Sequence, residues 1–377
     1  MSSYKKTILT TLELPPALRP EVPYVIDDYA LALYLGVRCK TLWYCVDQKA
    51  HLYKRFTIPK SDGRVRVIYN PKDRLKHLQR RVDLRILRTL PVLDCVGAYV
   101  EGRSCRDSAA RHAGHQVRIA MDLKDFFPSH TRAQIRHFFK QTIGYSHFVS
   151  GLLADLCTVQ ERRAPFRGKP PRHEAEEVKY RHFVPQGSPA SPMLCNLVAQ
   201  ERLDRPVLTA LAGTGWVYTR YSDDLSISHP EPRSRQQVDE LIETLRRLIL
   251  QAGYRTNPKK LKIQRCWRRQ QMLGMVVNEH PNIPADVYRR YRAIIHNCLL
   301  RGFEENAVRY GFDPVEAFAD HLRGKVAYFM QVNPARAVHL KTELEQAMAQ
   351  HAAAVAAAAA AGIAEGARED IDDGAAF

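Results

Sequence analysis

The 377-residue sequence lacks the patterns of several protein classes. Its eight cysteines include no C-x-x-C pair, which argues against a zinc site or disulfide framework and indicates reduced thiols in a cytoplasmic protein. No internal repeat or N-terminal signal sequence is visible, and no apolar run reaches the roughly 20 residues of a membrane-spanning helix. The alanine run at 352–361 is too weakly hydrophobic to span a membrane, and we expect a frayed helix leading into a disordered acidic end.

Negative charge is also scarce. The chain has 40 acidic residues against 57 lysines and arginines, which gives a formal net charge of +17. Solubility alone does not need this much charge of one sign. The excess predicts a polyanionic partner, either nucleic acid or an acidic membrane surface, and nucleic acid is favoured.

The order of expected elements indicates an α+β fold rather than an alternating βαβα chain. Asp62-Gly63 predicts a hairpin turn between two strands within 53–72, and Thr131 with Gln134 predicts a capping box. Residues 158–182 are polar and read as a surface insertion. Other strands are expected at 116–127, 218–228 (a hairpin), 261–264 and 272–278. Helices are expected from 26 to about 36 and at 73–90, 193–211, 234–253, 286–301, 314–331 and from 334 onward. This order favours an antiparallel sheet covered by helices on one face, followed by a basic helical bundle.

The stretch "YTRYSDDLSIS" (218–228) places two aspartates, Asp223 and Asp224, near a hairpin tip. Aspartate is common in turns, so turn chemistry alone is one explanation, and a site for a hard divalent cation is the other. Asp122 follows the apolar run Ile119-Ala120-Met121, where an ionised acid is costly unless it is paired or metal-bound; a satisfied edge residue is the alternative. Asp125 is a competing acid that we expect to cap a turn or face solvent. Three such carboxylates could hold two Mg²⁺ ions for phosphoryl transfer.

Several spaced blocks, in this order, resemble the palm of a reverse transcriptase: Asp122, "VPQGSPASP" (184–192), "YSDD", "NPKKLKI" (257–263) and "MLGMVVN" (272–278). The resemblance covers roughly residues 50–345. It implies a right-hand polymerase architecture with fingers, an antiparallel-sheet palm and a helical thumb. The implied division is an N-terminal helical extension at 1–51, fingers at 52–118, a palm at 119–280 with a fingers insertion near 128–182, a thumb at 281–350, and an alanine-rich acidic tail at 351–377.

The resemblance also implies roles for individual residues. Asp122, Asp223 and Asp224 would bind the two Mg²⁺ ions and serve as the catalytic set. Phe127 corresponds to an aromatic steric gate that disfavours a 2′-hydroxyl; an ordinary core phenylalanine is the alternative role, and Phe126 is the alternate position. The remaining implied nucleotide contacts are Gln186, Gly187, Lys60, Arg64, Arg66 and Lys260.

Within that set some choices stay open. Arg66 is the first choice for the triphosphate and Lys60 the second, whereas Arg64 is equally well explained as a solvated turn residue. Lys260 would lie near the leaving pyrophosphate, and Lys259 is its alternate. Gly187 would allow close approach of the backbone.

"RDSAARH" (106–112) and "LRGKVAYFMQVNP" (322–334) resemble retron reverse transcriptases, with Ser108 and His112 at positions implied to contact RNA. His112 is also explained as a packed or exposed histidine. The chain departs from the retron pattern at Met272-Leu273-Gly274, where V-T-G is usual. The helix expected at 286–301 carries an apolar and aromatic stripe, which could stack on RNA or pack against other helices, among arginines predicted to bind phosphates. The stripe is Tyr288, Tyr291, Ile295 and Leu299, and the arginines are Arg289, Arg290 and Arg292.

The resemblance implies an RNA-directed DNA polymerase that copies part of a structured noncoding RNA into single-stranded DNA from dNTPs. It further implies an antiphage role with a companion effector protein, and no membrane partner. One alternative is another defence or abortive-infection reverse transcriptase with untemplated or protein-primed synthesis. A second is a non-catalytic RNA-binding protein on a polymerase fold.

Overall fold

The computed structural model describes residues 22–59, 63, 65–162 and 180–372. The chain divides into two compact units. The first comprises Met1–Ser104 and Val117–Ile263, and the second comprises Cys105–Gln116 and Gln264–Phe377. The five-part division into extension, fingers, palm, thumb and tail remains a prediction, and each unit is described by itself.

A four-stranded sheet lies at the centre of the first unit, with the strand order β6-β7-β3-β8. Its pairs β3–β7 and β6–β7 are antiparallel, as predicted. Alternate residues of β3 (Val117, Ile119 and Met121) are buried in the main core. The strands are β3 (Val117–Asp122), β6 (Val217–Tyr221), β7 (Asp224–His229) and β8 (Lys262–Arg265), the last of which spans the division between the units.

The strand predicted at 116–127 is shorter than expected and ends at Asp122. Beyond it, the Leu123 amide donates to the Asp223 carbonyl at 2.9 Å, and the Lys124 amide donates to Arg255 at 2.7 Å. Asp125 then adopts a positive φ of 50°, which directs the chain out of the sheet. The hydrophobic run continues past this turn into Phe126, which is buried, and Phe127, which is half-buried, so hydrophobicity alone does not mark the end of the strand.

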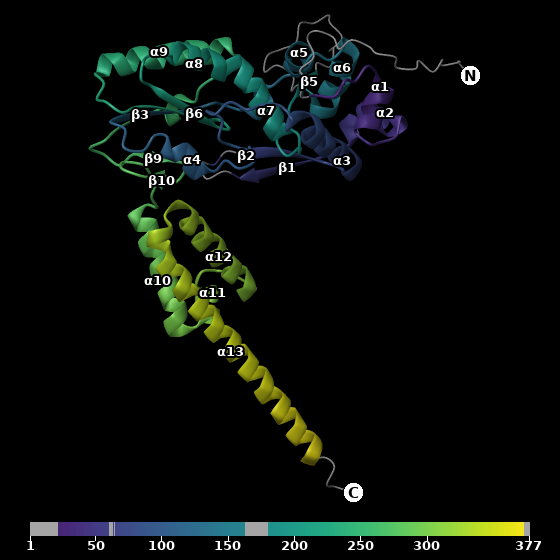
Figure 1. Ribbon diagram of the computed structural model, residues 1–377. Helices are drawn as coiled ribbons and strands as arrows, with labels where there is room; N and C mark the ends of the chain where they lie inside the picture. The colour runs from purple at the N-terminus through teal and green to yellow at the C-terminus, as the bar shows by residue number, and fades with distance from the viewer. Residues whose placement is uncertain (1–21, 60–62, 64, 163–179, 373–377) are drawn as a thin grey trace, which may run out of the picture. The chain divides into compact units, whose positions relative to one another are not determined.

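Helices cover one face of this sheet, as predicted, and Figure 1 shows α8 and α9 over β3 and β6. In α9 the buried residues Val238, Ile242, Leu245 and Ile249 recur every three or four positions, which gives the helix one apolar face. The covering helices are α7 (Ser191–Ala199), α8 (Arg205–Leu211) and α9 (Arg235–Gln251), with a π-helical segment, Gln200–Asp204, between α7 and α8.

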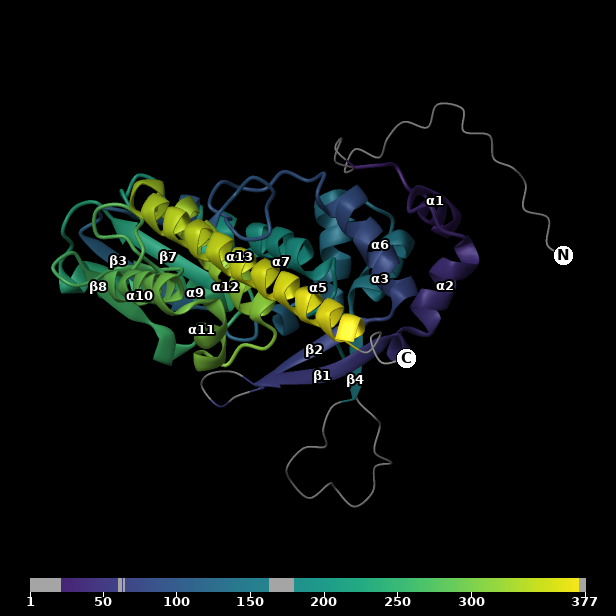
Figure 2. The ribbon, with the colours of Figure 1, turned by 90° about the horizontal axis from the view of Figure 1, so that it is seen from below.

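Two antiparallel hairpins form the other β structure of the first unit. β1 (Tyr53–Pro59) pairs with β2 (Val65–Pro71), which confirms the predicted strands, while the Asp62 turn together with Lys60 and Arg64 lies outside the described residues. β4 (Val159–Arg162) pairs with β5 (Tyr180–Phe183) at the two ends of the segment predicted as an insertion. Figure 2 shows β4 beside β1 and β2, where Tyr69, Val159 and Phe183 form a small cluster.

Further helices surround these hairpins. The predicted capping box is confirmed: Thr131 and Gln134 bond each other's backbone amides at the start of α5. The helix predicted at 73–90 is α3, followed by a π-helical turn, Asp83–Leu87. The helices are α1 (Asp28–Tyr34), α2 (Cys39–Asp47), α3 (Asp73–Val82), α5 (Arg132–His137) and α6 (His147–Cys157).

The second unit is mainly helical and has its own core, which includes Ile295, Phe318, Leu322 and Phe329. One helix was missed: Gly302, with a φ of 84°, ends α10, and a short helix follows before the one predicted at 314–331. The elements are α4 (Cys105–Ala110), β9 (Gln271–Met272), β10 (Met275–Val276), α10 (Ala285–Arg301), α11 (Phe303–Arg309), α12 (Val315–Val332) and α13 (Pro334–Asp372).

The acidic end predicted to be disordered is helical as far as Asp372, because α13 continues without a break through the alanine run. Alanine has the highest intrinsic helix propensity, so the backbone there needs no apolar partner to favour a helix. Among the described residues, no helix is both long and apolar enough to cross a membrane.

Candidate active site

The three predicted carboxylates meet at one end of the central sheet. Asp122, the last residue of β3, is the cross-strand partner of Asp224, the first residue of β7. Directly opposed residues of an antiparallel pair have Cα atoms about 4.5–5.5 Å apart and side chains on the same face. Asp223 lies in the two-residue turn between β6 and β7, and its carbonyl accepts the Leu123 amide at 2.9 Å. Residues about 100 positions apart in the chain therefore become neighbours.

The electrostatics show that these carboxylates repel one another. Burial, more than any other cause, raises the pKa of Asp223, and the charge of Asp122 adds to it. The pKa of Asp224 is raised to about 6, first by burial of the carboxylate among neighbouring atoms and then by Asp223 and Asp122, although part of the residue is open to solvent. Lys260 and Arg118 offset only part of this charge, so the site favours an additional cation.

Among the described residues, Lys260 forms the one direct ion pair with these acids. Its Nζ lies 2.5 Å from Oδ1 of Asp122, whose side chain is only 8% exposed, whereas the lysine side chain is 50% exposed. The hydrogen bond to Asp122 raises the pKa of Lys260. The ammonium group therefore supplies positive charge directly beside Asp122.

Carboxylate oxygens are the ligands that Mg²⁺ prefers, so the donor chemistry of Asp122, Asp223 and Asp224 fits that ion. Within the described part of the chain, however, no group of three or more His, Cys, Asp or Glu side chains is arranged to hold a metal ion.

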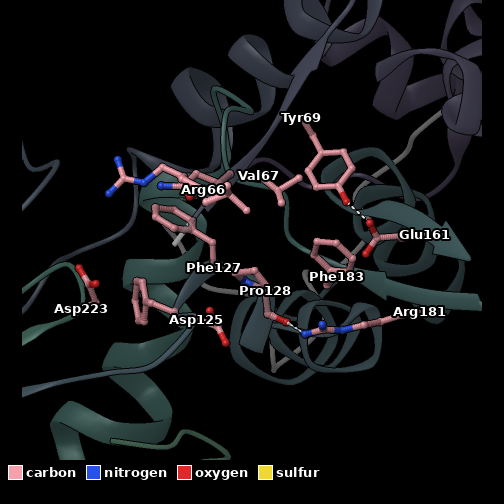
Figure 3. Close-up of a pocket in the computed structure, with 13 residues that line it drawn as sticks. Arg66, Val67, Tyr69, Asp125, Phe127, Pro128, Glu161, Arg181, Phe183 and Asp223 are labelled. Atoms are coloured by element: carbon pink, nitrogen blue, oxygen red, sulfur yellow. Dashed lines mark hydrogen bonds between the residues drawn. The ribbon is translucent and has the colours of Figure 1, made fainter. Parts of the chain in front are cut away.

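A pocket of about 320 Å³ opens beside the carboxylates (Figure 3). Three residues predicted to contact the nucleotide, Arg66, Phe127 and Gln186, line it together with Asp223. In the first unit, residues predicted to bind the triphosphate, the sugar and the metal therefore line one cavity. The remaining lining residues are Val65, Val67, Tyr69, Asp125, Phe126, Pro128, Glu161, Arg181 and Phe183.

The two phenylalanines after the β3 turn differ in burial. Phe126 is 3% exposed and packs edge-on against His130 at 5.0 Å between ring centroids. Phe127 is half-buried, and its ring centroid lies 6.5 Å from that of Tyr99. Figure 3 shows the Phe127 ring at the cavity near Arg66. The structure therefore favours Phe127 over Phe126 as the aromatic that faces a bound ligand.

Gly187 is required by the packing of its own backbone. It has a φ of +114°, and a Cβ there would come within 2.9 Å of the Tyr69 carbonyl oxygen. The neighbouring Gln186 carbonyl accepts the Tyr69 amide at 2.8 Å. These contacts hold the Gln186 loop against β2, which carries Arg66, so both residues reach the same cavity.

The residues predicted to bind RNA fall into two groups. Ser108 and His112 are buried, which favours the packing role that the sequence also allowed for His112, and their RNA contact remains a prediction. Arg289, Arg290 and Arg292 are exposed on α10. The stripe beside them packs inside the second unit: Tyr288 donates to the Arg336 carbonyl at 3.0 Å, and Tyr291 bonds His321 at 3.2 Å.

Several site residues escaped sequence reasoning. Glu161 and Arg181 line the pocket from β4 and β5, at the two ends of the predicted insertion, and Tyr69 of β2 donates to Glu161 at 2.5 Å. Arg220 is fully buried two residues before the acidic turn. A charged residue in the interior of an apolar strand was the available signal for Arg220, whereas nothing in the sequence pointed to Glu161.

Comparisons with known proteins agree with this geometry. Residues 58–277 match the family model "Reverse transcriptase (RNA-dependent DNA polymerase)". The chain is 34% identical over 300 residues to the Retron Mx65 reverse transcriptase of Myxococcus xanthus, covering 78% of this chain and 64% of that protein. It is 36% identical to the Retron Mx162 reverse transcriptase of the same organism (71% and 58% covered) and 28% identical to the Retron Ec86 reverse transcriptase of Escherichia coli (74% and 77% covered). The chain thus spans less than two thirds of the length of the two Myxococcus relatives.

Among solved structures, the chain resembles telomerase from Candida albicans in complex with a fragment of telomeric RNA, with a TM-score of 0.45 and 12% identity over 78% of this chain and 55% of that one. Apo telomerase from Candida tropicalis gives a TM-score of 0.39 and 12% identity over 65% and 59%. These distant likenesses add nothing to the assignment, which rests on the family match to more than half of the chain. The chain belongs to the reverse transcriptase family, and its curated relatives named above are retron members of that family.

Proposed function

We propose that this chain is an RNA-directed DNA polymerase of the retron type, which copies part of a structured noncoding RNA into single-stranded DNA. The observation that carries the proposal is the pairing of Asp122 with Asp224 beside a cavity that Arg66, Phe127 and Gln186 share with Asp223. The retron relatives support the choice of RNA template and dNTP substrates. A cytoplasmic location, an antiphage role and a companion effector protein follow from the same resemblance.

In this proposal Asp122, Asp223 and Asp224 hold two Mg²⁺ ions. When bound, the ions lower the pKa of the primer 3′-hydroxyl and neutralise charge that develops on the attacked phosphate. The raised pKa values of Asp223 and Asp224 support this role, because a divalent cation would remove the repulsion that raises them. Lys260 would provide positive charge near the departing pyrophosphate, and its ion pair with Asp122 supports this role.

The cavity residues select and orient the nucleotide. Arg66 is exposed at the cavity and binds the triphosphate through its guanidinium group. Phe127 packs under the sugar and excludes a 2′-hydroxyl, while Gln186 contacts the nucleotide from a loop that Gly187 holds against β2. Holding the reacting groups in one geometry is a large part of the catalytic effect in phosphoryl transfer.

Primer extension on a defined RNA template tests the proposal. The wild-type protein should extend a DNA primer with dNTPs and Mg²⁺. Asp223→Asn should lower the rate at least about 1000-fold, the effect expected when metal stabilisation worth several kcal/mol is lost. Asp94→Asn, at a side chain that is 90% exposed, is the control and should extend normally. A folded wild-type protein without extension activity would leave the RNA-binding alternative on a polymerase fold.

One observation favours a second candidate, a defence reverse transcriptase with untemplated or protein-primed synthesis. Leu273 and Gly274, where retron enzymes usually have T-G, form the tight turn between β9 and β10, with φ angles of 50° and 81°. Sequencing the nucleic acid that co-purifies with the protein separates the candidates. A covalent RNA–DNA joint supports the retron type, whereas DNA without a template sequence supports the second candidate.

RNA binding by the second unit is tested through salt dependence. Arg289, Arg290 and Arg292 are exposed on one helix and lack an ion pair in the described part of the chain. Replacing all three with alanine should weaken binding and reduce the slope of log affinity against log salt by about 2, because each phosphate contact contributes about 0.7 on single strands. An unchanged slope would show that these arginines do not contact phosphates.

A further inference from the structure

Arg220 is an unusual residue for its place in the fold. It lies in the interior of β6, and both its side chain and that of its partner Asp204 are 0% exposed. Removing a guanidinium group and a carboxylate from water is costly, and the cost is repaid only when every polar atom finds a good partner. A charged residue at this buried position therefore needs a physical explanation, because an apolar residue would avoid the cost of desolvation.

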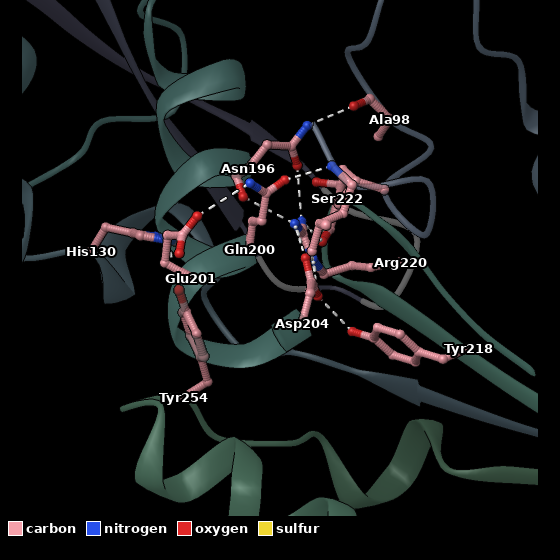
Figure 4. Close-up of polar contacts among 12 residues, drawn as sticks. Ala98, His130, Asn196, Gln200, Glu201, Asp204, Tyr218, Arg220, Ser222 and Tyr254 are labelled. Carbon is pink, nitrogen blue, oxygen red and sulfur yellow. Dashed lines mark hydrogen bonds and ion pairs between the residues drawn. The ribbon is translucent and has the colours of Figure 1, made fainter. Parts of the chain in front are cut away.

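All five N–H donors of Arg220 have an acceptor (Figure 4). Nε donates to Asp204 Oδ1 at 2.9 Å, and Nη2 donates to Asp204 Oδ2 at 2.7 Å. Nη2 also donates to the Asn196 carbonyl at 3.1 Å, and Nη1 donates to Asn196 Oδ1 at 2.9 Å. The last bond runs from Nη1 to the Ser222 carbonyl at 3.2 Å. Only a planar, forked cation satisfies this geometry.

The network ties β6 to two other segments of the first unit. Asn196 and Asp204 come from α7 and from the π-helical segment that follows it. On the other side, the Arg220 amide donates to the Cys95 carbonyl at 2.7 Å, and Asn196 Nδ2 donates to the Ala98 carbonyl at 2.6 Å. Tyr218, on the same strand, also donates to Asp204 at 2.7 Å. The position of β6 is thus fixed from the helices and from the 95–98 loop.

The bond to Ser222 carries this rigidity to the active site. Ser222 has a positive φ of 60°, which is uncommon for a residue with a side chain and persists only where surrounding contacts hold it. It immediately precedes Asp223 and Asp224, so its conformation determines where both carboxylates point. We propose that Arg220, held by Asp204, is a positioning residue that fixes the Ser222 turn and thereby aims Asp223 and Asp224 at the metal ions and the nucleotide. This role rests on the proposed function, since it presumes that these carboxylates bind metal.

The competing explanation is that the pair only stabilises the core. A double variant distinguishes the two explanations. Replacing both partners of a buried ion pair is often tolerated, so the protein can fold without the pair, whereas removing one partner leaves an uncompensated charge. Arg220→Met with Asp204→Asn removes both charges and keeps an acceptor for Tyr218. It also removes the bond to the Ser222 carbonyl. Arg220→Lys is a second variant that keeps the positive charge but loses the fork.

The experiment measures Mn²⁺ binding to the full chain by electron paramagnetic resonance, together with melting temperature and primer extension. Arg88→Met with Asp83→Asn is the matched control, since Arg88 Nε bonds the buried Asp83 at 2.8 Å within the same unit and contacts neither the hairpin nor the cavity. We expect the Arg220→Met/Asp204→Asn protein to fold but to bind Mn²⁺ about 10- to 100-fold more weakly, the range for lost outer partners of metal ligands. Extension should fall by roughly 100-fold, the cost of misplacing reacting groups by about 1 Å. The control variant should match the wild type in both measurements.

Arg220→Lys should show the same direction of change with a smaller loss of melting temperature, and it carries the test if the double variant does not fold. Wild-type Mn²⁺ affinity and extension in a folded Arg220 variant of either kind would overturn the positioning role. Such a result would leave the proposed function intact as long as Asp223→Asn abolishes binding. If the wild-type protein itself bound no Mn²⁺, the metal chemistry and the role of Arg220 would both be overturned.

Discussion

Two ion pairs, Arg220–Asp204 and Lys260–Asp122, lie on opposite faces of the sheet near the β6–β7 hairpin. They differ in burial and in the number of hydrogen bonds. In the strand register Arg220 lies opposite Leu225, on the face covered by helices. Asp224 lies opposite Asp122, on the other face. The Arg220–Asp204 pair has no exposure and uses every donor. The Lys260–Asp122 pair consists of one bond from a lysine that is 50% exposed.

The difference shows how one hairpin combines rigidity with an exchangeable site. A buried, fully bonded pair cannot open without leaving charges unpaired, so the helix-covered face holds the turn in place. The half-exposed lysine is rehydrated when it leaves Asp122, whereas the carboxylate, 8% exposed, then needs another cation as its partner. The open face can therefore trade an ammonium group for a metal ion while the carboxylates keep their positions.

The largest expected effect is the difference in the free energy of unfolding between variants that break the Arg220–Asp204 pair and the Lys260–Asp122 pair. Arg220→Met should lower the free energy of unfolding by about 3–5 kcal/mol, because it leaves Asp204 charged and buried. Lys260→Met should lower it by less, because the lysine side chain is 50% exposed, although the Asp122 side chain that it leaves is only 8% exposed. Urea unfolding followed by circular dichroism measures both. Equal losses in the two variants would contradict the distinction between a closed and an open face.

A second prediction concerns the selection of the nucleotide sugar at the open face. Phe127→Ala should reduce the preference for deoxynucleotides over ribonucleotides by about 10- to 200-fold, the usual worth of a steric contact in a pocket. Single-nucleotide incorporation with dNTP and rNTP measures it. Phe126→Leu is the control, since this ring is buried and should affect melting temperature rather than selectivity. A larger change of selectivity in Phe126→Leu would move the steric gate by one residue.

The smallest effect is a pH dependence that should appear on the open face. The pKa of Asp224 is raised from 3.8 to about 6, so the folded protein retains a proton that the unfolded chain has already released in this range. The group therefore lowers stability as the pH rises through that window. In a chelating buffer, Asp224→Asn should melt at a higher temperature than the wild type above about pH 6, and the difference should vanish toward about pH 4. A constant difference across this range would contradict the raised pKa.

Local patterns in the sequence predicted most of the elements and many of the site residues. Alternation around "YTRYSDDLSIS" predicted the hairpin, and Thr131 with Gln134 predicted a helix start, because strand pairing and helix caps depend on residues close together in the chain. The prediction of the strand end was wrong where the hydrophobic run continues beyond the strand. The strand ending at Asp122 was extended to Pro128 because Phe126 and Phe127 continue the apolar run, although they pack beyond a turn.

The amino-acid sequence specifies the chemical groups and the order of the elements: three acids, a basic excess and a spacing of blocks that matches a reverse transcriptase. Which of these charges become neighbours depends on how the chain folds. The register of β3 against β7 opposes Asp122 to Asp224, and helix packing brings Asp204 to Arg220. Such pairings join residues far apart in the chain, and their energies depend on burial, which no local pattern of residues encodes.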